Sequence, residues 1–352
     1  MSGDSFGRIF RLTTFGESHG PGLGGIVEGC PAGIELNPAH IQAELDRRRP
    51  GQTFGSTTRK EPDRVEILSG LFEGRTTGTA IGFYVPNRDQ RSRDYSRIKD
   101  IYRPGHGDLT YEAKYGVRDY RGGGRSSGRE TVCRVAGGAI ASRFLLTRGI
   151  NILAYTRELG GVEARPHGMS NIFDNPFVCP DPEVLPIWET MVQEAAREGD
   201  SLGGVVEIVA ENVPAGLGEP VFDKLDARLA YALMSVGAVK GVEVGSGFEA
   251  ARLRGSQNND QMNAKGFLSN NAGGVLAGIS SGQPLMVRAA VKPIPSIAKP
   301  QKTITSKGRE TEIRVGGRHD VSAIPRIVPV LKAMTALVLA DMYLLQKAGT
   351  KD

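Results

Sequence analysis

Residues 130–148 read ETVCRVAGGAIASRFLLTR, a helix pattern that ends before Gly149 and strongly restricts how this chain can fold. The middle of the pattern, AGGAIAS, holds only small or apolar residues. Each glycine inside a helix costs about 1 kcal/mol relative to alanine, and close approach by a neighbouring element is the usual compensation. We therefore expect this helix at the centre of the protein.

The other helix and strand patterns do not alternate along the chain. Strands are predicted at residues 8–15, 23–28, 204–209, 241–245 and 283–291, and helices at 38–49, 184–198, 222–235 and 327–347. This order favours an α+β fold over a doubly wound parallel sheet. No linker or low-complexity segment divides the 352 residues, so we predict one domain, 1–352, with long inserted loops.

A faint internal repeat suggests two related βα halves, about 1–150 and 200–347. In the first, the strand-like run LGGIVE at 23–28 is followed by the turn PAG and a helix; in the second, LGGVVE at 202–207 is followed by PAG and a helix. Chance similarity in a chain with 47 glycines is the alternative. The two segments should superpose if they are repeats.

Charge and cysteine content describe an ordinary globular protein. The net charge of +5 permits an anionic partner without requiring nucleic acid, and basic residues are not interleaved with aromatic ones as in nucleic-acid-binding modules. Cys30, Cys133 and Cys179 are far apart, and no Cys/His spacing fits a metal site. We expect buried free thiols in a reducing cytoplasm and no metal.

Neither end of the chain predicts a membrane segment. The first residues lack the apolar core of a signal peptide. The most apolar stretch, 327–345, is interrupted by Lys332 and Asp341, which is typical of a core helix rather than a membrane span.

The stretch RGGGRSSGRE at 121–130 indicates an anion site. Successive glycines can present backbone N–H groups to a phosphate, while Arg125 and Arg129 can add charge-assisted hydrogen bonds. Ser126 and Ser127 can donate hydroxyls, and the helix that follows directs its N-terminus to the same place. A solvated flexible loop and an RNA-binding RGG segment are the alternatives.

Three of the five histidines lie in glycine-rich loops beside charged residues: His19 in GESHG, His106 in RPGHGD and His319 in GGRHD. Imidazoles in such loops suit proton transfer near neutral pH. A single loop histidine is more often a surface residue, but three in similar loops favour a shared site.

Familiar catalytic motifs are absent from the chain. GPGLGG at 20–25 matches GxGxxG formally, but a strand-like run and a PAG turn follow it instead of a helix, so it does not predict a dinucleotide site. The sequence also lacks GxSxG, HExxH and P-loop motifs. The chemistry should therefore rest on acid–base groups, arginines and an organic cofactor.

Several segments together resemble the chorismate synthase family. They are GESHGPGLGGIVEGCPAG at 16–33, DRRRPG at 46–51, DQRSRDY at 89–95, RPGHGDLTYEAKYGVRDYRGGGRSSGRET at 103–131 and GGRHDVSAIPR at 316–326. The resemblance extends over nearly the whole chain, from Ser5 to about Lys347.

This resemblance implies a β-α-β sandwich with central helices between antiparallel sheets, usually as a homotetramer. It implies a lyase that uses reduced FMN to convert 5-enolpyruvylshikimate 3-phosphate into chorismate by 1,4-anti elimination, the last step of the shikimate pathway. Some members reduce their own flavin with NADPH. This chain has no added reductase domain, so we expect an external flavin reductase to supply reduced FMN.

The resemblance also implies roles for individual residues. His19 would protonate the departing phosphate, His106 would stand near the flavin, and Asp320, with Ser18 nearby, would assist proton removal from the substrate. Arg48, and secondarily Arg47 and Arg49, would bind the substrate anion; in this family Arg48 is sometimes assigned to NADP instead. The residues expected to line FMN are Arg125, Ser126, Ser127, Gly237, Ala238, Ala277, Lys292, Pro293, Ile294, Pro295, Ser296 and Arg318.

Two positions depart from the family pattern. Phe54 stands where many bacterial members have a second arginine after DRRRPG, and Arg59 or Lys60 could supply that contact. Val321 follows Asp320 where the usual residue is proline. We expect activity to survive both. A flavin-dependent oxidoreductase acting on a phosphorylated substrate is the alternative function.

Overall fold

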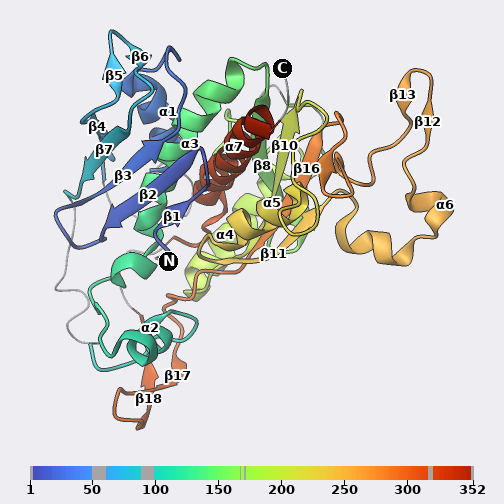
Figure 1. Cartoon of the computed structure of the whole chain (residues 1–352). Coiled ribbons are helices and arrows are strands. Elements are labelled where there is room, and N and C mark those ends of the chain that lie inside the picture. The colour runs from blue at the N-terminus through green and yellow to red at the C-terminus, as the bar shows by residue number, and fades with distance from the viewer. Residues whose placement is uncertain are drawn as a thin grey trace.

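Two antiparallel sheets enclose a layer of helices in the computed structural model (Figure 1). The structure describes residues 3–49, 61–88, 99–166, 168–169, 172–315 and 320–349. The first sheet has the order β1-β2-β3-β7-β4 and the second β11-β16-β10-β8-β9. The helices α1, α3, α5 and α7 pack between or beside them. The predicted α+β sandwich is confirmed.

The two main sheets and the helical layer have the following bounds. The first sheet contains β1 (Ser5–Phe6), β2 (Arg11–Gly16), β3 (Gly22–Glu28), β7 (Ile81–Pro86) and β4 (Glu66–Ile67). The second contains β11 (Val239–Val244), β16 (Leu285–Val291), β10 (Gly204–Glu211), β8 (Asn151–Leu159) and β9 (Val162–Glu163). The helices are α1 (Pro38–Arg48), α3 (Thr131–Leu146), α5 (Leu225–Met234) and α7 (Ile324–Gly349).

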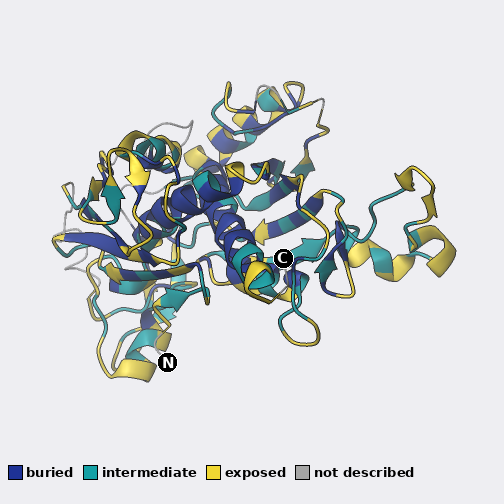
Figure 2. Ribbon diagram, turned by 45° about the horizontal axis from the view of Figure 1, so that its top comes forward, coloured by how far each residue is buried: buried dark blue, intermediate teal, exposed yellow. Residues whose placement is uncertain are grey.

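Shorter elements lie outside this core. They are α2 (Asp108–Tyr115), α4 (Leu185–Glu198), α6 (Gly255–Asn258) and the hairpins β5 (Leu71–Phe72)–β6 (Arg75–Thr76), β12 (Met262–Asn263)–β13 (Gly266–Phe267), β14 (Val275–Leu276)–β15 (Ile279–Ser280) and β17 (Gln301–Ile304)–β18 (Glu310–Ile313). Figure 2 shows buried residues concentrated in the helical layer, whereas the projecting segment with α6, β12 and β13 is mostly exposed.

The glycine pair in α3 allows the close helix approach that the sequence predicted. A Cβ on Gly138 would lie 2.3 Å from Cβ of Ala333 in α7, and one on Gly137 would lie 2.8 Å from the Leu12 side chain in β2. At Gly138 the neighbours include the Ala333 backbone, so only glycine fits there, whereas a side chain at Gly137 would require the end of the Leu12 side chain to move. Because α3 touches α7 on one side and the first sheet on the other, its helical axis lies in the protein centre.

Asp341 is one of the two charged residues that interrupt the apolar helix α7, and its buried carboxylate is satisfied by backbone hydrogen bonds. Its side chain is 1% exposed. It accepts hydrogen bonds from the backbone N–H groups of Arg8 at 3.0 Å, Ile9 at 2.7 Å and Phe10 at 3.0 Å. In the described part of the chain α7 is the helix long and apolar enough to cross a membrane, but 83% of its apolar window is buried inside the protein. The helix is therefore core.

We expect Asp341→Ala to lower the free energy of unfolding by roughly 3 kcal/mol, because buried N–H groups that lose their acceptor cost about 1–3 kcal/mol each. Urea denaturation measures the loss. Thr335→Val on the same helix is the control, since it removes only a bond from Thr335 Oγ1 to the Leu331 carbonyl within the helix. Equal stability of the two variants would contradict the role given to Asp341.

The two segments of the predicted internal repeat occupy equivalent places in the two sheets. β3 is the middle strand of the first sheet, and the PAG turn and α1 follow it. β10 is the middle strand of the second, and the PAG turn and α5 follow it. Gly33 and Gly216, which end the two turns, both have positive φ, +82° and +105°. The superposition of the two halves stays a prediction.

Candidate active site

A cavity of about 670 Å³ lies where β1, β2, α1, α3, α5 and α7 meet the loop around His106. Five cationic side chains line it, against three carboxylates. The cations are Arg48, Arg125, Arg134, Lys292 and Arg326, and the carboxylates are Asp4, Glu130 and Asp320. An apolar wall of Leu12, Val236, Ile327, Val330 and Met334 completes it. The excess of cations suits an anionic ligand, and the apolar wall suits one with a flat ring.

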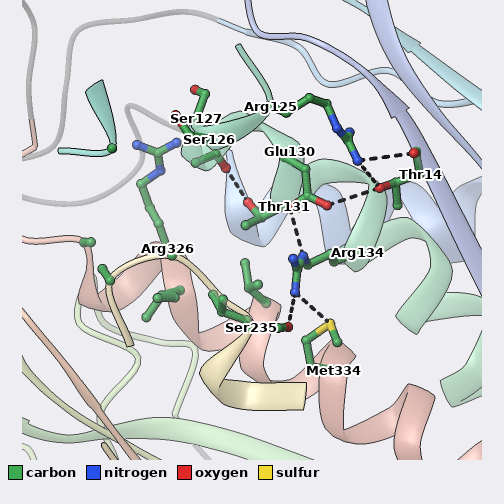
Figure 3. Close-up of a pocket in the computed structure, with 18 of the residues that line it drawn as sticks. Thr14, Arg125, Ser126, Ser127, Glu130, Thr131, Arg134, Ser235, Arg326 and Met334 are labelled. Carbon is green, nitrogen blue, oxygen red and sulfur yellow. Dashed lines mark hydrogen bonds and ion pairs between the residues drawn. The ribbon is translucent and has the colours of Figure 1, made fainter. Parts of the chain in front are cut away.

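Eleven of the residues singled out in the sequence line this cavity. They are Arg48, His106, Arg125, Ser126, Ser127, Gly237, Ala238, Lys292, Ile294, Pro295 and Asp320. They come from distant parts of the chain, and only the fold brings them together. Figure 3 shows part of this arrangement, with Arg125, Ser126 and Ser127 above the cavity and Arg326 at its side.

The three glycines at 122–124 turn the chain rather than line the cavity. Their φ angles of +78°, +88° and +53° are in the left-handed region that favours glycine. The cavity is lined instead by residues 125–128. The predicted glycine nest is therefore replaced by a glycine turn that presents the following arginine and serines.

Arg125 is held in place by the first two strands. One terminal nitrogen donates to Thr14 Oγ1 at 2.7 Å and to Asp4 Oδ1 at 2.9 Å, and the other donates to the Gly16 carbonyl at 3.3 Å. Figure 3 shows its guanidinium directed toward Thr14. The charge is thus fixed at the cavity wall before any ligand arrives.

Arg48 is the member of the arginine triplet that reaches the cavity. Its side chain is 4% exposed and bonds to Asp63 at 2.9 Å, Thr131 Oγ1 at 2.9 Å and the Gly128 carbonyl at 3.0 Å. Burial lowers the pKa of Arg48 to about 10, with the charge of Asp63 opposing that shift. The guanidinium therefore stays protonated at neutral pH.

The other two arginines of the triplet point elsewhere. Arg47 pairs with Glu44 at 2.6 Å, lies 4.2 Å from the Phe173 ring and does not line the cavity. Arg49 lies 3.4 Å from Asp46 and also stays outside. Consecutive helix residues are rotated by about 100°, so one of three adjacent arginines can face a given ligand.

Arg129 faces the protein interior instead of the anion site expected for it. It bonds Asp63 at 2.6 Å and Asn87 at 2.6 Å, and it lies 3.6 Å from Glu61. Together with Arg48 it forms a buried cluster of two arginines and two carboxylates, which we call the Asp63 cluster. This cluster supports the wall behind residues 125–131.

The loop that carries His106 contacts the segment 292–296. His106 Nε2 lies 2.6 Å from Ser296 Oγ, and Lys292 Nζ donates to the Gly105 carbonyl at 2.7 Å. Gly105 has a φ of +71°, and a Cβ there would lie 2.8 Å from Pro295. Burial, and to a smaller extent Lys240, lowers the pKa of Lys292. The His106 loop and the segment 292–296, both predicted to lie at the cofactor, therefore meet at this imidazole.

Asp320 enters the cavity at the start of α7 and is paired with Arg326. The guanidinium of Arg326 also donates through Nε to the Arg48 carbonyl at 3.3 Å. The start of α7 is thereby joined to the end of α1. Arg326 lay within a family segment but was not predicted as a site residue.

His19 and Ser18 lie beside the cavity rather than in its lining. Ser18 Oγ is 3.1 Å from His19 Nδ1. The imidazole packs against the glycine turn, since a Cβ on Gly122 would be 2.5 Å from His19 Cε1. Both residues therefore contact the loop that presents residues 125–128.

The remaining predicted residues divide into two groups. Pro293, Ser296 and Ala277 do not line the cavity, although Ser296 reaches it through His106. Arg318, His319, Phe54, Arg59 and Lys60 lie outside the described residues. The roles proposed for all of these stay predictions.

Arg134 is a cavity residue that the sequence analysis missed. It projects from α3 and donates through Nε to the Glu130 carboxylate at 2.8 Å and through a terminal nitrogen to Ser235 Oγ, at the end of α5, at 2.6 Å. Its guanidinium also lies 3.7 Å from Met334 Sδ in α7, as Figure 3 shows. A Glu–Arg pair four residues apart in an otherwise apolar helix was the signal that could have indicated it.

The cysteines form no part of this site. Cys30, Cys133 and Cys179 are free and buried, as predicted. Burial raises the pKa of the Cys30 and Cys133 thiols to about 12 and that of Cys179 to about 11. Among the described residues no group of three or more His, Cys, Asp and Glu side chains could hold a metal.

Comparison with known proteins gives one family over the whole chain. A family model described as chorismate synthase matches residues 10–344. The chorismate synthase of Oleidesulfovibrio alaskensis is 66% identical over 351 residues, and that of Maridesulfovibrio salexigens is 65% identical over 347 residues; each alignment covers 99% of both chains. A crystal structure of a chorismate synthase matches with a TM-score of 0.77 and 36% identity, over 98% of this chain and 94% of that one.

Proposed function

The chain belongs to the chorismate synthase family of lyases, and on that premise we propose that it converts 5-enolpyruvylshikimate 3-phosphate into chorismate and phosphate by 1,4-anti elimination with reduced FMN. The observation that carries the proposal is the cavity with five cationic side chains against three carboxylates. Phosphate monoesters carry about −1.5 to −2 charges each near pH 7, so two such ligands side by side need this excess.

The lining residues fit a flavin mononucleotide. The volume lies within the roughly 300–1,000 Å³ typical of ligand sites, and an apolar wall faces the cationic one. At Gly237 a Cβ would meet no atom within 4 Å, and Ala238 has a φ of +75°, so this backbone is open to a close ligand. Arg125, Ser126, Ser127 and Lys292 would hold the anionic and polar groups. When bound, reduced FMN supplies the electron-rich ring and the N5 base that the elimination requires.

In this proposal the side chains of the protein bind the anions and move protons. Arg48 would bind the substrate anion, since it reaches the cavity from α1 and stays charged. His106 would hold a proton at the cavity wall, beside the ring of the flavin. Asp320, oriented by Arg326, would support removal of the substrate's ring proton, and His19 would protonate the departing phosphate.

The decisive experiment is an anaerobic assay with 5-enolpyruvylshikimate 3-phosphate and chemically reduced FMN, followed by phosphate release and chorismate absorbance. Product formed with catalytic flavin, and none with oxidised FMN, supports the proposal. Tight flavin binding without product would overturn it. With NADPH in place of the chemical reductant, stoichiometric consumption of NADPH without chorismate would instead favour a flavin-dependent oxidoreductase.

We also propose the following setting for the enzyme. It would act in the cytoplasm in aromatic amino-acid biosynthesis, as a homotetramer, and would receive reduced FMN from an external flavin reductase. Replacing the chemical reductant by NADPH in the same assay tests the last point. Turnover with FMN and with NADPH as the sole reductant would show that the chain reduces its own flavin.

We expect Arg125→Ala to raise the dissociation constant of FMN by at least about tenfold, because hydrogen bonds to charged groups contribute roughly 1.5–3 kcal/mol. Quenching of flavin fluorescence measures it. Arg121→Ala is the matched control, since Arg121 pairs with Asp119 at 2.9 Å and does not line the cavity. An unchanged constant for Arg125→Ala would refute its assigned contact.

A further inference from the structure

The loop that presents His106 is closed by an ion pair between its two ends. Arg103 begins the loop and Asp108 ends it, five residues later. The Arg103 side chain donates to Asp108 through Nε at 2.8 Å and through the terminal nitrogen at 2.8 Å, and the Arg103 backbone N–H adds a third bond at 3.0 Å. Both residues are buried, with 8% and 5% exposure. The pair therefore closes residues 103–108 into a ring.

The geometry inside the ring directs the imidazole toward the cavity. The His106 N–H donates to the Arg103 carbonyl at 3.3 Å, which tightens the turn. Gly105 supplies the left-handed backbone at its apex, with φ of +71°. From outside the ring, Ser296 and Lys292 contact the same apex. His106 is thus constrained from both sides.

The carboxylate in this pair stays ionised. Burial alone would raise the pKa of the Asp108 carboxyl, but the hydrogen bonds and charge of Arg103, with a smaller effect of Arg118, outweigh it and hold that pKa below its usual range. The pair is therefore intact over the whole range from about pH 5 to 8 in which an imidazole titrates.

Stability by itself gives little reason for such a pair. Removing two charges from water costs several kcal/mol per ion, and a packed hydrophobic pair of similar volume is often equally stable. The lobe that contains α2 and the β17–β18 hairpin has other attachments (Figure 1). Arg118 pairs with Glu112 at 2.9 Å, lies 3.5 Å from Asp108 and lies over the Tyr102 ring. Ile101 forms a β-bridge with Thr305. Unlike those contacts, a bidentate pair between the two ends of the loop also fixes the orientation of the loop.

We propose that Arg103 and Asp108 are positioning residues whose ion pair fixes the loop 103–108 so that the His106 imidazole faces the reacting groups in the cavity. The inference rests on the proposed function, in which His106 acts there. Neither side chain lines the cavity. The Arg103 guanidinium also borders the glycine turn, since a Cβ on Gly123 would lie 3.8 Å from its terminal nitrogen. The test must therefore separate an effect through His106 from one through that turn.

The test compares steady-state kinetics of Asp108→Asn and Arg103→Lys in the anaerobic assay with reduced FMN. We expect kcat to fall about 100-fold, as displacement of a catalytic group by about 1 Å can cost that much. KM for the substrate and the dissociation constant of FMN should stay at wild-type values, because the anion-binding side chains are untouched. Wild-type kcat in both variants would overturn the proposal.

A double-mutant cycle separates positioning from a merely structural role. If Asp108 acts through His106, Asp108→Asn causes no further loss of kcat in a His106→Ala background; independent losses that multiply would overturn the proposal. Glu112→Gln is the control, since it weakens the Arg118 attachment of α2 and leaves the ring closed; we expect wild-type kcat from it.

Failure of this inference is distinguishable from failure of the proposed function. A wild-type enzyme that makes no chorismate under these conditions would overturn the proposed function itself. An active wild type together with fully active Asp108→Asn would overturn only the positioning role. If Asp108→Asn does not fold, Arg103→Lys keeps the charge but loses the planar fork, and the same loss of kcat is expected from it.

Discussion

His106→Ala is expected to lower kcat by about 10²–10⁴-fold, the usual contribution of a general acid–base group, while FMN still binds. The imidazole lines the cavity at the point where the loop 103–108 meets the segment 292–296. Alanine removes the proton-carrying group but leaves the cationic wall of Arg48, Arg125 and Arg326 unchanged. The loss should therefore appear in turnover and not in flavin affinity.

Single-turnover kinetics with reduced FMN and a parallel fluorescence titration measure the two quantities separately. His40→Ala is a matched control, because His40 lies in the first turn of α1, where its side chain accepts a bond from the Asn37 N–H at 3.3 Å. We expect wild-type kcat from that control. Full activity of His106→Ala would remove the imidazole from the proposed mechanism.

Arg129→Ala should have the largest effect on stability, a loss of about 3–5 kcal/mol in the free energy of unfolding, as expected when one partner of a buried ion pair is removed. Its guanidinium is 4% exposed and neutralises Asp63 and Glu61, whose side chains are 0% exposed. Without it, the buried Asp63 carboxylate loses one of the two guanidinium groups that neutralise it. Such a loss is a large part of the roughly 5–15 kcal/mol that stabilises a typical domain.

Urea denaturation of the variant against Arg121→Ala tests this prediction. The Arg121–Asp119 pair is similar in chemistry but half-exposed on the arginine side, and pairs of that kind contribute about 0–1 kcal/mol. Equal stability of the two variants would show that the Asp63 cluster does not support the fold. Arg129→Lys, which keeps a charge but loses the planar fork, should lie between them.

Much of the cavity could be predicted because its residues lie in short contiguous motifs. RSS at 125–127 and KPIPS at 292–296 are short contiguous segments, so one cavity residue in each indicates its neighbours, although Pro293 and Ser296 do not line the cavity. The choice among Arg47, Arg48 and Arg49 was harder, although the sequence contained the answer. Ile41, Leu45 and Arg48 share one buried face of α1, so helical phase alone favours Arg48.

Other assignments could not be made from the sequence because they depend on distant partners. Arg125 and Arg129 are one turn apart and look equivalent in RGGGRSSGRE. Arg129 turns inward because Asp63, 66 positions away, offers it a buried carboxylate. Arg326 enters the site because it meets the Arg48 carbonyl, 278 positions away. No local pattern records either partner.

The sequence by itself predicted the central place of α3, most of the long helices and several strands of both sheets, but not the sheet strands β7 and β8. It also predicted an anionic ligand. Periodicity, glycine placement and side-chain chemistry are local properties, and they act on the chain before it folds. The tertiary structure decided which charges face the cavity and which are neutralised behind it. A guanidinium has the same charge wherever it points, and its direction depends on the carboxylates and carbonyls that the completed fold places around it.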